Sequence, residues 1–171
     1  MARKTGVIEG NDLMLFVNTS TTGSPTWSET AHATNHTISW SAATKERKTK
    51  TTGKWAQKIV TGYSCQIKCE ALVSYKDGVG YKEFMEMFKK GVPVLLKFSH
   101  KEVEAQDEFE QGEFLITNID ENAAAGEDAS YSATFENYGE VETKKAATPT
   151  NLSASGEMQE EGAGLEADGN E

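Results

Sequence analysis

The chain has 171 residues, of which 37% are apolar and 26% charged, and its formal net charge is −10 at neutral pH. This length predicts one domain of ordinary size with a real hydrophobic core. Six acidic residues and no Lys or Arg follow Ala147, so the rest of the chain carries only −4. A mildly acidic body argues against a dedicated DNA-binding protein, which needs a surplus of basic residues.

The first part of the chain predicts an arm and two strands. Residues 1–12 are polar and contain Gly, which is typical of an N-terminal arm. The apolar block Leu13–Val17 predicts a strand, and the Gly- and Pro-containing segment Asn18–Trp27 predicts a turn-rich loop. The alternating segment His36–Ala42 predicts a second strand, with Trp40 on its apolar face and therefore in the core.

A long basic stretch follows from Ala43 to Ala56. It has no apolar periodicity, so we expect an extended loop covering about residues 43–57 rather than a regular element. One interpretation is a solvated surface loop, and the other is a protruding arm that binds an acidic partner surface. Its basic residues, opposed only by Glu46, are Lys45, Arg47, Lys48, Lys50 and Lys54.

The middle of the chain gives the clearest periodic signals. Ser64–Tyr75 places six apolar residues on alternate positions and therefore predicts a strand. A helix is expected at about residues 80–90, ending at Gly91, with two lysines in its last turn. Its apolar stripe, at the spacing of one helix face, consists of Tyr81, Phe84, Met85 and Phe88.

Further strands are predicted at Pro93–Ser99, Glu113–Ile119 and Ser130–Glu136. Six or seven strands and one helix predict a mainly β fold, an antiparallel β-sandwich or barrel with the helix on its flank. We divide the chain into the arm 1–12, a β-domain 13–142 and an acidic tail 143–171. The tail lacks apolar periodicity and is expected to be disordered.

The sequence shows no constellation that predicts catalysis, a cofactor or a metal. His32 and His36 are four residues apart but lack the glutamate of the zinc-protease motif. Cys65 and Cys69 would lie about 13 Å apart in a strand, too far for a disulfide. No signal peptide or long apolar run is present, so neither secretion nor a membrane span is expected. A hydrolase would require His32 or His100 to be buried beside a Ser and an acid.

Several stretches resemble the major tail protein (tail tube) family of long-tailed phages and gene transfer agents. They follow one another in that family's order, and include a G-x-F-x-I-T strand that begins at Gly112. An Ala- and Gly-rich loop precedes the final alternating strand. The stretches are GNDLMLFV (10–17), ATNHTISWSA (33–42), the run from Cys65 to Phe98, and the run from Phe109 to Glu142.

This resemblance implies a non-enzymatic structural subunit. Six copies would close a ring whose strands form a barrel around a lumen, and stacked rings would form the conduit for DNA during genome ejection. The implied partners are further copies, the tail initiator and terminator, the tape-measure protein, and DNA that passes without specific binding. The site of assembly would be the host cytoplasm and the final location the virion tail. On this basis we assign the basic stretch and the N-terminal arm to contacts between rings.

Two alternatives remain open from the sequence. The chain could form the tube of a contractile tail or injection system, which shares the ring principle. It could instead be a β-sandwich module that binds carbohydrate or mediates adhesion, which would require a surface cluster of aromatic residues. The candidates for such a cluster are Trp27, Trp40 and Trp55.

Overall fold

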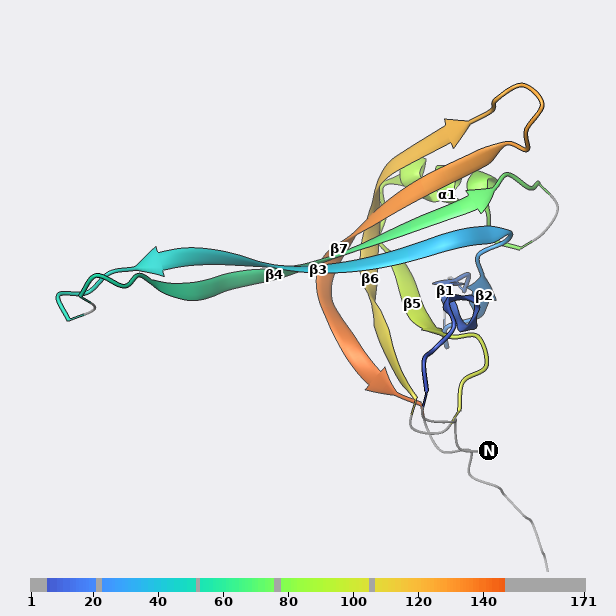
Figure 1. Cartoon of the computed structure of the whole chain (residues 1–171). Helices are drawn as coiled ribbons and strands as arrows, with labels where there is room; N and C mark the ends of the chain where they lie inside the picture. Colours follow the sequence, from blue (N-terminus) through green and yellow to red (C-terminus); the bar gives the residue numbers. More distant parts are fainter. Residues whose placement is uncertain (1–5, 21–22, 52, 76–77, 105–106, 147–171) are drawn as a thin grey trace, which may run out of the picture.

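A computed structural model describes residues 6–20, 23–51, 53–75, 78–104 and 107–146 (Figure 1). This part of the chain forms seven strands, one α-helix and a short 3₁₀ helix, η1. In chain order the elements are η1 (Gly10–Asp12), β1 (Leu13–Asn18), β2 (Trp27–Glu29), β3 (Ala33–Arg47), β4 (Gln57–Leu72), α1 (Tyr81–Lys90), β5 (Val94–His100), β6 (Glu108–Asn122) and β7 (Ser130–Lys145).

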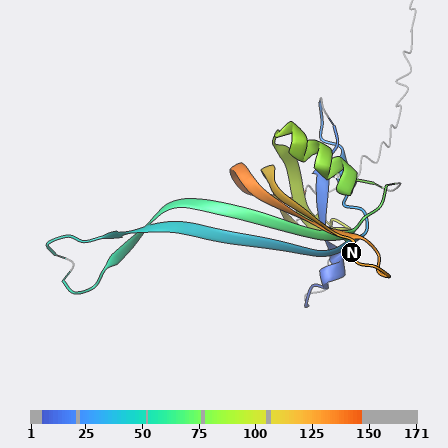
Figure 2. The same cartoon turned by 90° about the horizontal axis from the view of Figure 1, so that it is seen from above.

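All seven strands belong to one antiparallel sheet with the order β2-β1-β5-β6-β7-β4-β3. The sheet curls. This is evident from His36 of β3 and Phe98 of β5, whose ring centroids lie 6.4 Å apart although three strands separate β3 from β5 in the sheet. The predicted fold class, a mainly β antiparallel fold with one flanking helix, is confirmed. The helix lies against one face of the sheet (Figure 2).

The hydrophobic core lies between the sheet and α1. Phe84 of α1 has no exposed surface. The centroid of its ring lies 5.3 Å from that of Phe135 of β7, in an edge-on arrangement, and 6.1 Å from that of Tyr131. Tyr81, one turn earlier, contacts the same Tyr131 ring at 5.7 Å. Aromatic pairs of this geometry add to the burial of their area, so this cluster fixes the helix on the sheet.

Both ends of α1 follow from the sequence. The Glu83 carboxylate accepts a hydrogen bond of 3.0 Å from the backbone N–H of Gly80, which satisfies one of the free donors at the helix start. Gly91 ends the helix with φ at 63°, and its N–H is bonded to the carbonyls of Met87 and Phe88. A left-handed residue at this place favours Gly. The predicted helix at about 80–90 is therefore confirmed.

The expected loop at about 43–57 begins too early but ends where expected, and the strand that follows it was expected only from Ser64. Strand β3 continues to Arg47 and β4 begins at Gln57, so only the residues between them connect the strands. The prediction failed because both faces of these strand ends are exposed, so no apolar alternation marks them. Trp40 follows the predicted phase, but it is 52% exposed, because the described residues leave the sheet uncovered at that position.

Other boundaries also differ from the prediction. The short strand β2 lies at the end of the segment expected to be a loop, and β4 ends at Leu72 rather than Tyr75. Strand β7 extends to Lys145, so residues 143–145 belong to the sheet and not to a tail. The expected disorder from Ala147 onward lies outside the described residues, and so do residues 1–5 of the expected N-terminal arm.

Gly112 has the least room for a side chain among the described glycines. A Cβ there would lie 3.1 Å from Cγ2 of Val141 and 3.2 Å from the carbonyl oxygen of Glu140. We expect Gly112→Ala to lower the free energy of unfolding by about 1–3 kcal/mol, because the backbone of β7 must move to admit the methyl group. Urea denaturation would measure this. Gly62→Ala is the control, since no atom lies within 4 Å of its Cβ position. Equal losses in both variants would contradict this explanation.

Candidate assembly surfaces

A two-stranded ribbon projects from the sheet (Figure 1). Strands β3 and β4 pair along their whole length, as far as Arg47 opposite Gln57. Strand β7 pairs with β4 only from Gln66 to Leu72, so the outer halves of β3 and β4 have no third strand beside them in the described part of the chain. We call the described residues between 40 and 64 the arm.

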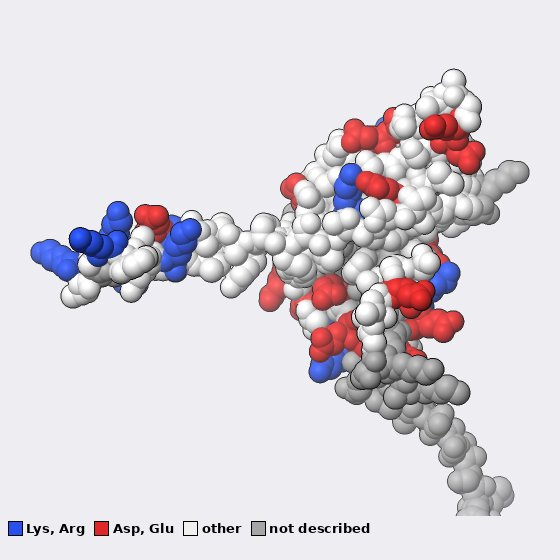
Figure 3. Space-filling model, viewed as in Figure 1, with Lys and Arg blue, Asp and Glu red and all other residues white. Residues whose placement is uncertain are grey.

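The arm concentrates positive charge at its far end (Figure 3). Lys45 and Arg47 extend along β3, while Lys48, Lys50 and Lys54 lie in the connection to β4. The five predicted site residues therefore come together at one end of the molecule. With Lys58 they make six basic residues against Glu46 alone, and none of the six forms an ion pair with another described residue.

The remainder of residues 1–146 has the opposite charge. It contains 11 basic and 20 acidic residues, a net charge of −9, compared with +5 for residues 43–58. Acidic side chains are spread over the body in Figure 3. The small net charge of −4 seen in the sequence therefore conceals a strongly polar distribution, with a basic arm attached to an acidic body.

Large apolar side chains of the arm are also uncovered. Trp55 is 87% exposed, Tyr63 77% and Val60 45%, in addition to Trp40. An isolated two-stranded ribbon is at best marginally stable in water, because neither of its faces is buried. The arm has the composition of a surface that another molecule covers.

The base of the arm is a fork where β4 and β7 separate. At this point the side chain of Asn137 takes the place of a backbone partner, and its Oδ1 accepts a 2.9 Å hydrogen bond from the N–H of Cys65. Beyond the fork, β7 pairs only with β6. A shallow groove of about 220 Å³ lies here, lined by Trp40, Tyr63 and Val141 among others. The fork leaves two strand edges without backbone partners among the described residues.

The model of a family described as phage tail tube protein matches residues 7–143. The chain belongs to the phage tail tube protein family. Membership in this structural family indicates a structural role. None of the curated proteins matches the chain significantly in sequence.

Solved structures share the fold of this tail tube protein. A chain from the tail of an empty gene transfer agent particle with C6 symmetry aligns with a TM-score of 0.67 and 19% identity, covering 81% of this chain and 99% of that chain. The SPP1 tail tube aligns with a TM-score of 0.65 and 12% identity, covering 82% of this chain and 81% of that chain. A chain from the sheath–tube complex of an extracellular contractile injection system aligns with a TM-score of 0.57 and 11% identity, covering 84% of this chain and 95% of that chain.

The face of the sheet opposite α1, which we call the outer face, is polar in this tail tube protein. Its residues are those that alternate with the core residues of β3, β4, β6 and β7. They include Ser39 and Ser41; Gln66, Lys68 and Glu70; Asn118 and Asp120; and Ser132, Thr134 and Glu136. Hydroxyl, amide and carboxylate groups predominate on this face, and Lys68 is the one cation among the residues named.

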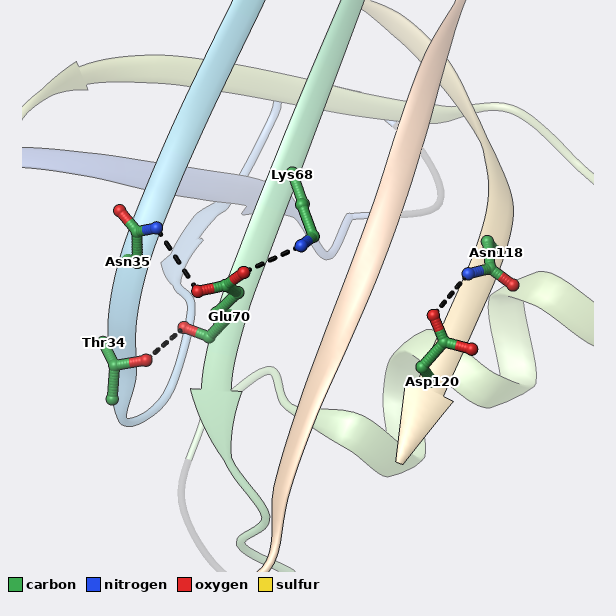
Figure 4. A network of polar contacts seen from close by, with 6 residues as sticks. All are labelled: Thr34, Asn35, Lys68, Glu70, Asn118 and Asp120. Carbon is green, nitrogen blue, oxygen red and sulfur yellow. Dashed lines mark hydrogen bonds and ion pairs between the residues drawn. The ribbon is translucent and has the colours of Figure 1, made fainter. Parts of the chain in front are cut away.

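The ammonium of Lys68 is already engaged. It lies 2.8 Å from Oε1 of Glu70, whose Oε2 accepts a hydrogen bond from the Asn35 amide at 3.3 Å (Figure 4). The hydrogen bond to Glu70 raises the pKa of Lys68, and the same bond lowers the pKa of Glu70. Asp120, held at 2.6 Å by the Asn118 amide, adds a further carboxylate to this face. The outer face thus offers carboxylates without an unengaged cation among these residues.

The two cysteines are buried in the core and not bonded to each other. Burial raises the pKa of Cys65 to about 11 and that of Cys69 to about 12. We expect both thiols to resist alkylation or a disulfide reagent at pH 8 in the folded protein and to react rapidly in denaturant, because thiolate is the reactive form. Mass spectrometry of the labelled protein would measure this. Fast labelling of the native protein would contradict the assigned burial.

Two of the three histidines lie at least partly inside the described structure. His36 is partly buried, which lowers its pKa, and His100 is buried at the end of β5. The described residues contain no group of three or more His, Cys, Asp or Glu side chains placed to hold a metal ion. They also contain no helix long and apolar enough to cross a membrane.

The fork is the feature that sequence reasoning missed. The signal was present as Asn137 and Gly139 near the middle of an otherwise alternating strand, a pattern that indicates a bulge or a break in pairing. In the structure the Asn137 amide also donates a 2.8 Å hydrogen bond to the carbonyl of Gly139. The single residue therefore stabilises both sides of the break.

Proposed function

We propose that this chain is the repeating subunit of a tail tube, with copies closing into hexameric rings that stack into a conduit for DNA. The observation that carries the proposal is the arm, which no other described part of the chain covers. Support also comes from the family match and from the C6 symmetry of the gene transfer agent tail that shares the fold.

We assign the arm to contacts between successive rings. A contact between two different surfaces of the same chain does not close on itself, so it extends a stack. The separation of charge favours such head-to-tail growth, because the basic arm of one copy is attracted to the acidic body of the next. Lys45, Arg47, Lys48, Lys50 and Lys54 are the proposed contact residues.

We assign the outer face of the body, without the arm, to the lumen. A conduit must let DNA slide, and carboxylates repel phosphates while an unengaged lysine would hold them. The engagement of Lys68 by Glu70 suits this requirement. The tail initiator, the terminator and the tape-measure protein are the further proposed partners, the host cytoplasm is the proposed site of assembly, and the virion tail is the proposed location.

The tube of a contractile injection system is a second candidate, favoured by the shared fold of the sheath–tube complex. A sheath would have to bind the outside of such a tube. A glycan-binding module is less well supported, because Trp27, Trp40 and Trp55 lie on β2, on the base of the arm and at its tip. Trp27 also lies 5.0 Å below the ammonium of Lys97, which covers its ring.

Negative-stain electron microscopy of the purified protein over a concentration series tests the proposed function. We expect hollow tubes or rings with sixfold end views, and assembly that becomes more extensive as concentration rises. A protein that stays monomeric at every concentration, even with its tail initiator complex added, would contradict the proposal.

A further inference from the structure

Several strand edges of the described structure are open, and two of them carry pairs of side chains with opposite charge: Lys45 and Arg47 on β3, and Glu140 and Glu142 on β7. The outer edge of β3 has no partner, since β3 pairs only with β4. The edge of β7 beyond the fork, from Tyr138 to Lys145, pairs only with β6. Open edges present unpaired backbone N–H and C=O groups and accept a further strand readily.

The charged side chains on these two edges match in spacing. Lys45 and Arg47 are two residues apart on β3, in the same alternating phase as Ser39 and Ser41. This phase places them on the outer face. The match requires acidic residues on the second edge with the same spacing and on the same face.

Strand β7 provides such a pair. Val141 packs against the core, so Glu140 and Glu142 point to the outer face on either side of it. If the two edges joined, the basic and acidic pairs would lie opposite each other on one face of a continuous sheet. Directly opposed side chains in neighbouring strands are about 5 Å apart, and pairs of opposite charge there are favourable.

The edge of β7 also has excess negative charge around it. Its two lysines are already engaged, Lys144 with Glu142 at 3.0 Å and Lys145 with Glu108 at 3.3 Å. On the neighbouring strand β6, Glu110 has a pKa raised by burial and by the charge of Glu108. Glu110 is in phase with Gly112 and acts on the core residue Cys65, so its charge lies on the core face and adds to the negative surroundings of the edge without belonging to the pairs on the outer face.

We infer that the outer edge of the β3 arm adds to the open β7 edge of a second copy, with Lys45 and Arg47 facing Glu140 and Glu142. This inference rests on the proposed function, in that the second copy belongs to the adjacent ring. The acids at the turn between β6 and β7, Glu127 and Asp128, do not meet the requirement. They adjoin strand ends that are already paired on both sides, as Ser130 is with Leu72 and Asn122.

Charge exchange between the two edges tests the inference. Variant one is K45E/R47E and variant two is E140K/E142K. Each variant alone places like charges opposite each other at every contact. We therefore expect the yield of tubes that sediment on centrifugation to fall about tenfold or more. An equal mixture of the two variants pairs opposite charges at every contact of an alternating stack. It should recover most of the wild-type yield.

The control combines K45E/R47E with E127K/D128K in one chain, which restores net charge without restoring the pairing. We expect it to stay unassembled. Circular dichroism must show that each variant is folded. Assembly of either variant alone at the wild-type level would overturn the inference, as would failure of the folded mixture to assemble while wild-type protein forms tubes. Failure of the wild type itself would instead count against the proposed function.

Oxidative cross-linking tests the same pairing without requiring a tube. A chain with Arg47→Cys is mixed with a second chain carrying Glu140→Cys or Glu142→Cys. We expect a disulfide-linked dimer from at least one combination, and the stronger one identifies the register. The native thiols are buried and should not interfere. Arg47→Cys mixed with Glu127→Cys is the control, and cross-linking no higher than this control would overturn the inference.

Discussion

Reversing four charges of the arm in the variant K45E/R47E/K48E/K50E should abolish tube elongation and leave the fold unchanged. The four side chains are exposed and form no ion pair with another described residue, so their loss removes no internal contact. Surface changes of this kind alter stability by about 0.5 kcal/mol or less. We therefore expect a melting temperature within about 2 °C of the wild type, and electron micrographs without tubes.

A matched control reverses lysines on the helix, in the variant K82E/K89E/K90E. These residues are exposed as well, and they lie on α1, away from the strand edges that we assign to assembly. Tubes should form normally from this protein. Normal tubes from the arm variant would show that the basic residues do not contribute to contacts between rings. Loss of tubes in both variants would point to net charge as the cause.

Truncating Phe84 to Ala should give the largest loss of stability among single substitutions in the helix. The side chain has no exposed surface and contacts the rings of Tyr131 and Phe135. Removing a buried Phe side chain costs about 3–5 kcal/mol, because burial is lost and a cavity remains. Thermal and urea denaturation of the variant would measure the loss. The variant should also form fewer tubes at the temperature at which it begins to unfold.

Phe88, one turn further along the same stripe, provides the comparison. It is 41% exposed, so Phe88→Ala should cost less than about 1.5 kcal/mol. The sequence assigns both residues to one apolar face and cannot rank them. Similar losses from the two substitutions would mean that α1 is not fixed to the sheet in the way described.

Prediction from the sequence succeeded where one face of an element is buried. The alternating apolar residues of β4 from Cys65 to Ala71 record contact with the core, and so do Tyr81 and Phe84 of the predicted stripe of α1. The other two members were predicted less well, because Met87 packs against the core and Phe88 is exposed. The helix end at Gly91 was predicted for a different reason, since a backbone with positive φ leaves few residue choices. In the first two cases the local pattern and the tertiary contact require the same residues, whereas at Gly91 the local backbone conformation alone is sufficient.

The same reasoning failed on the arm because its pattern is set by contacts outside the chain. Residues 43–47 and 57–63 form strands without a buried face of their own, so the alternation on which a strand prediction depends is missing. The basic residues were recognised as a unit from composition alone. Their position at the end of a ribbon, and the open edge of β7 with Glu140 and Glu142, depend on pairings between segments far apart in the sequence.

The fork between β4 and β7 also has a consequence for subunits that have been synthesised but not yet incorporated. Open strand edges on every free molecule would promote irregular aggregation in the cell. On the arm, Lys45 and Arg47 oppose this, because two arms that approach each other bring like charges together. The charges that we propose to select the correct neighbour therefore also keep free subunits apart from one another. High salt would weaken this protection, since about 1 M salt screens charges beyond roughly 3 Å.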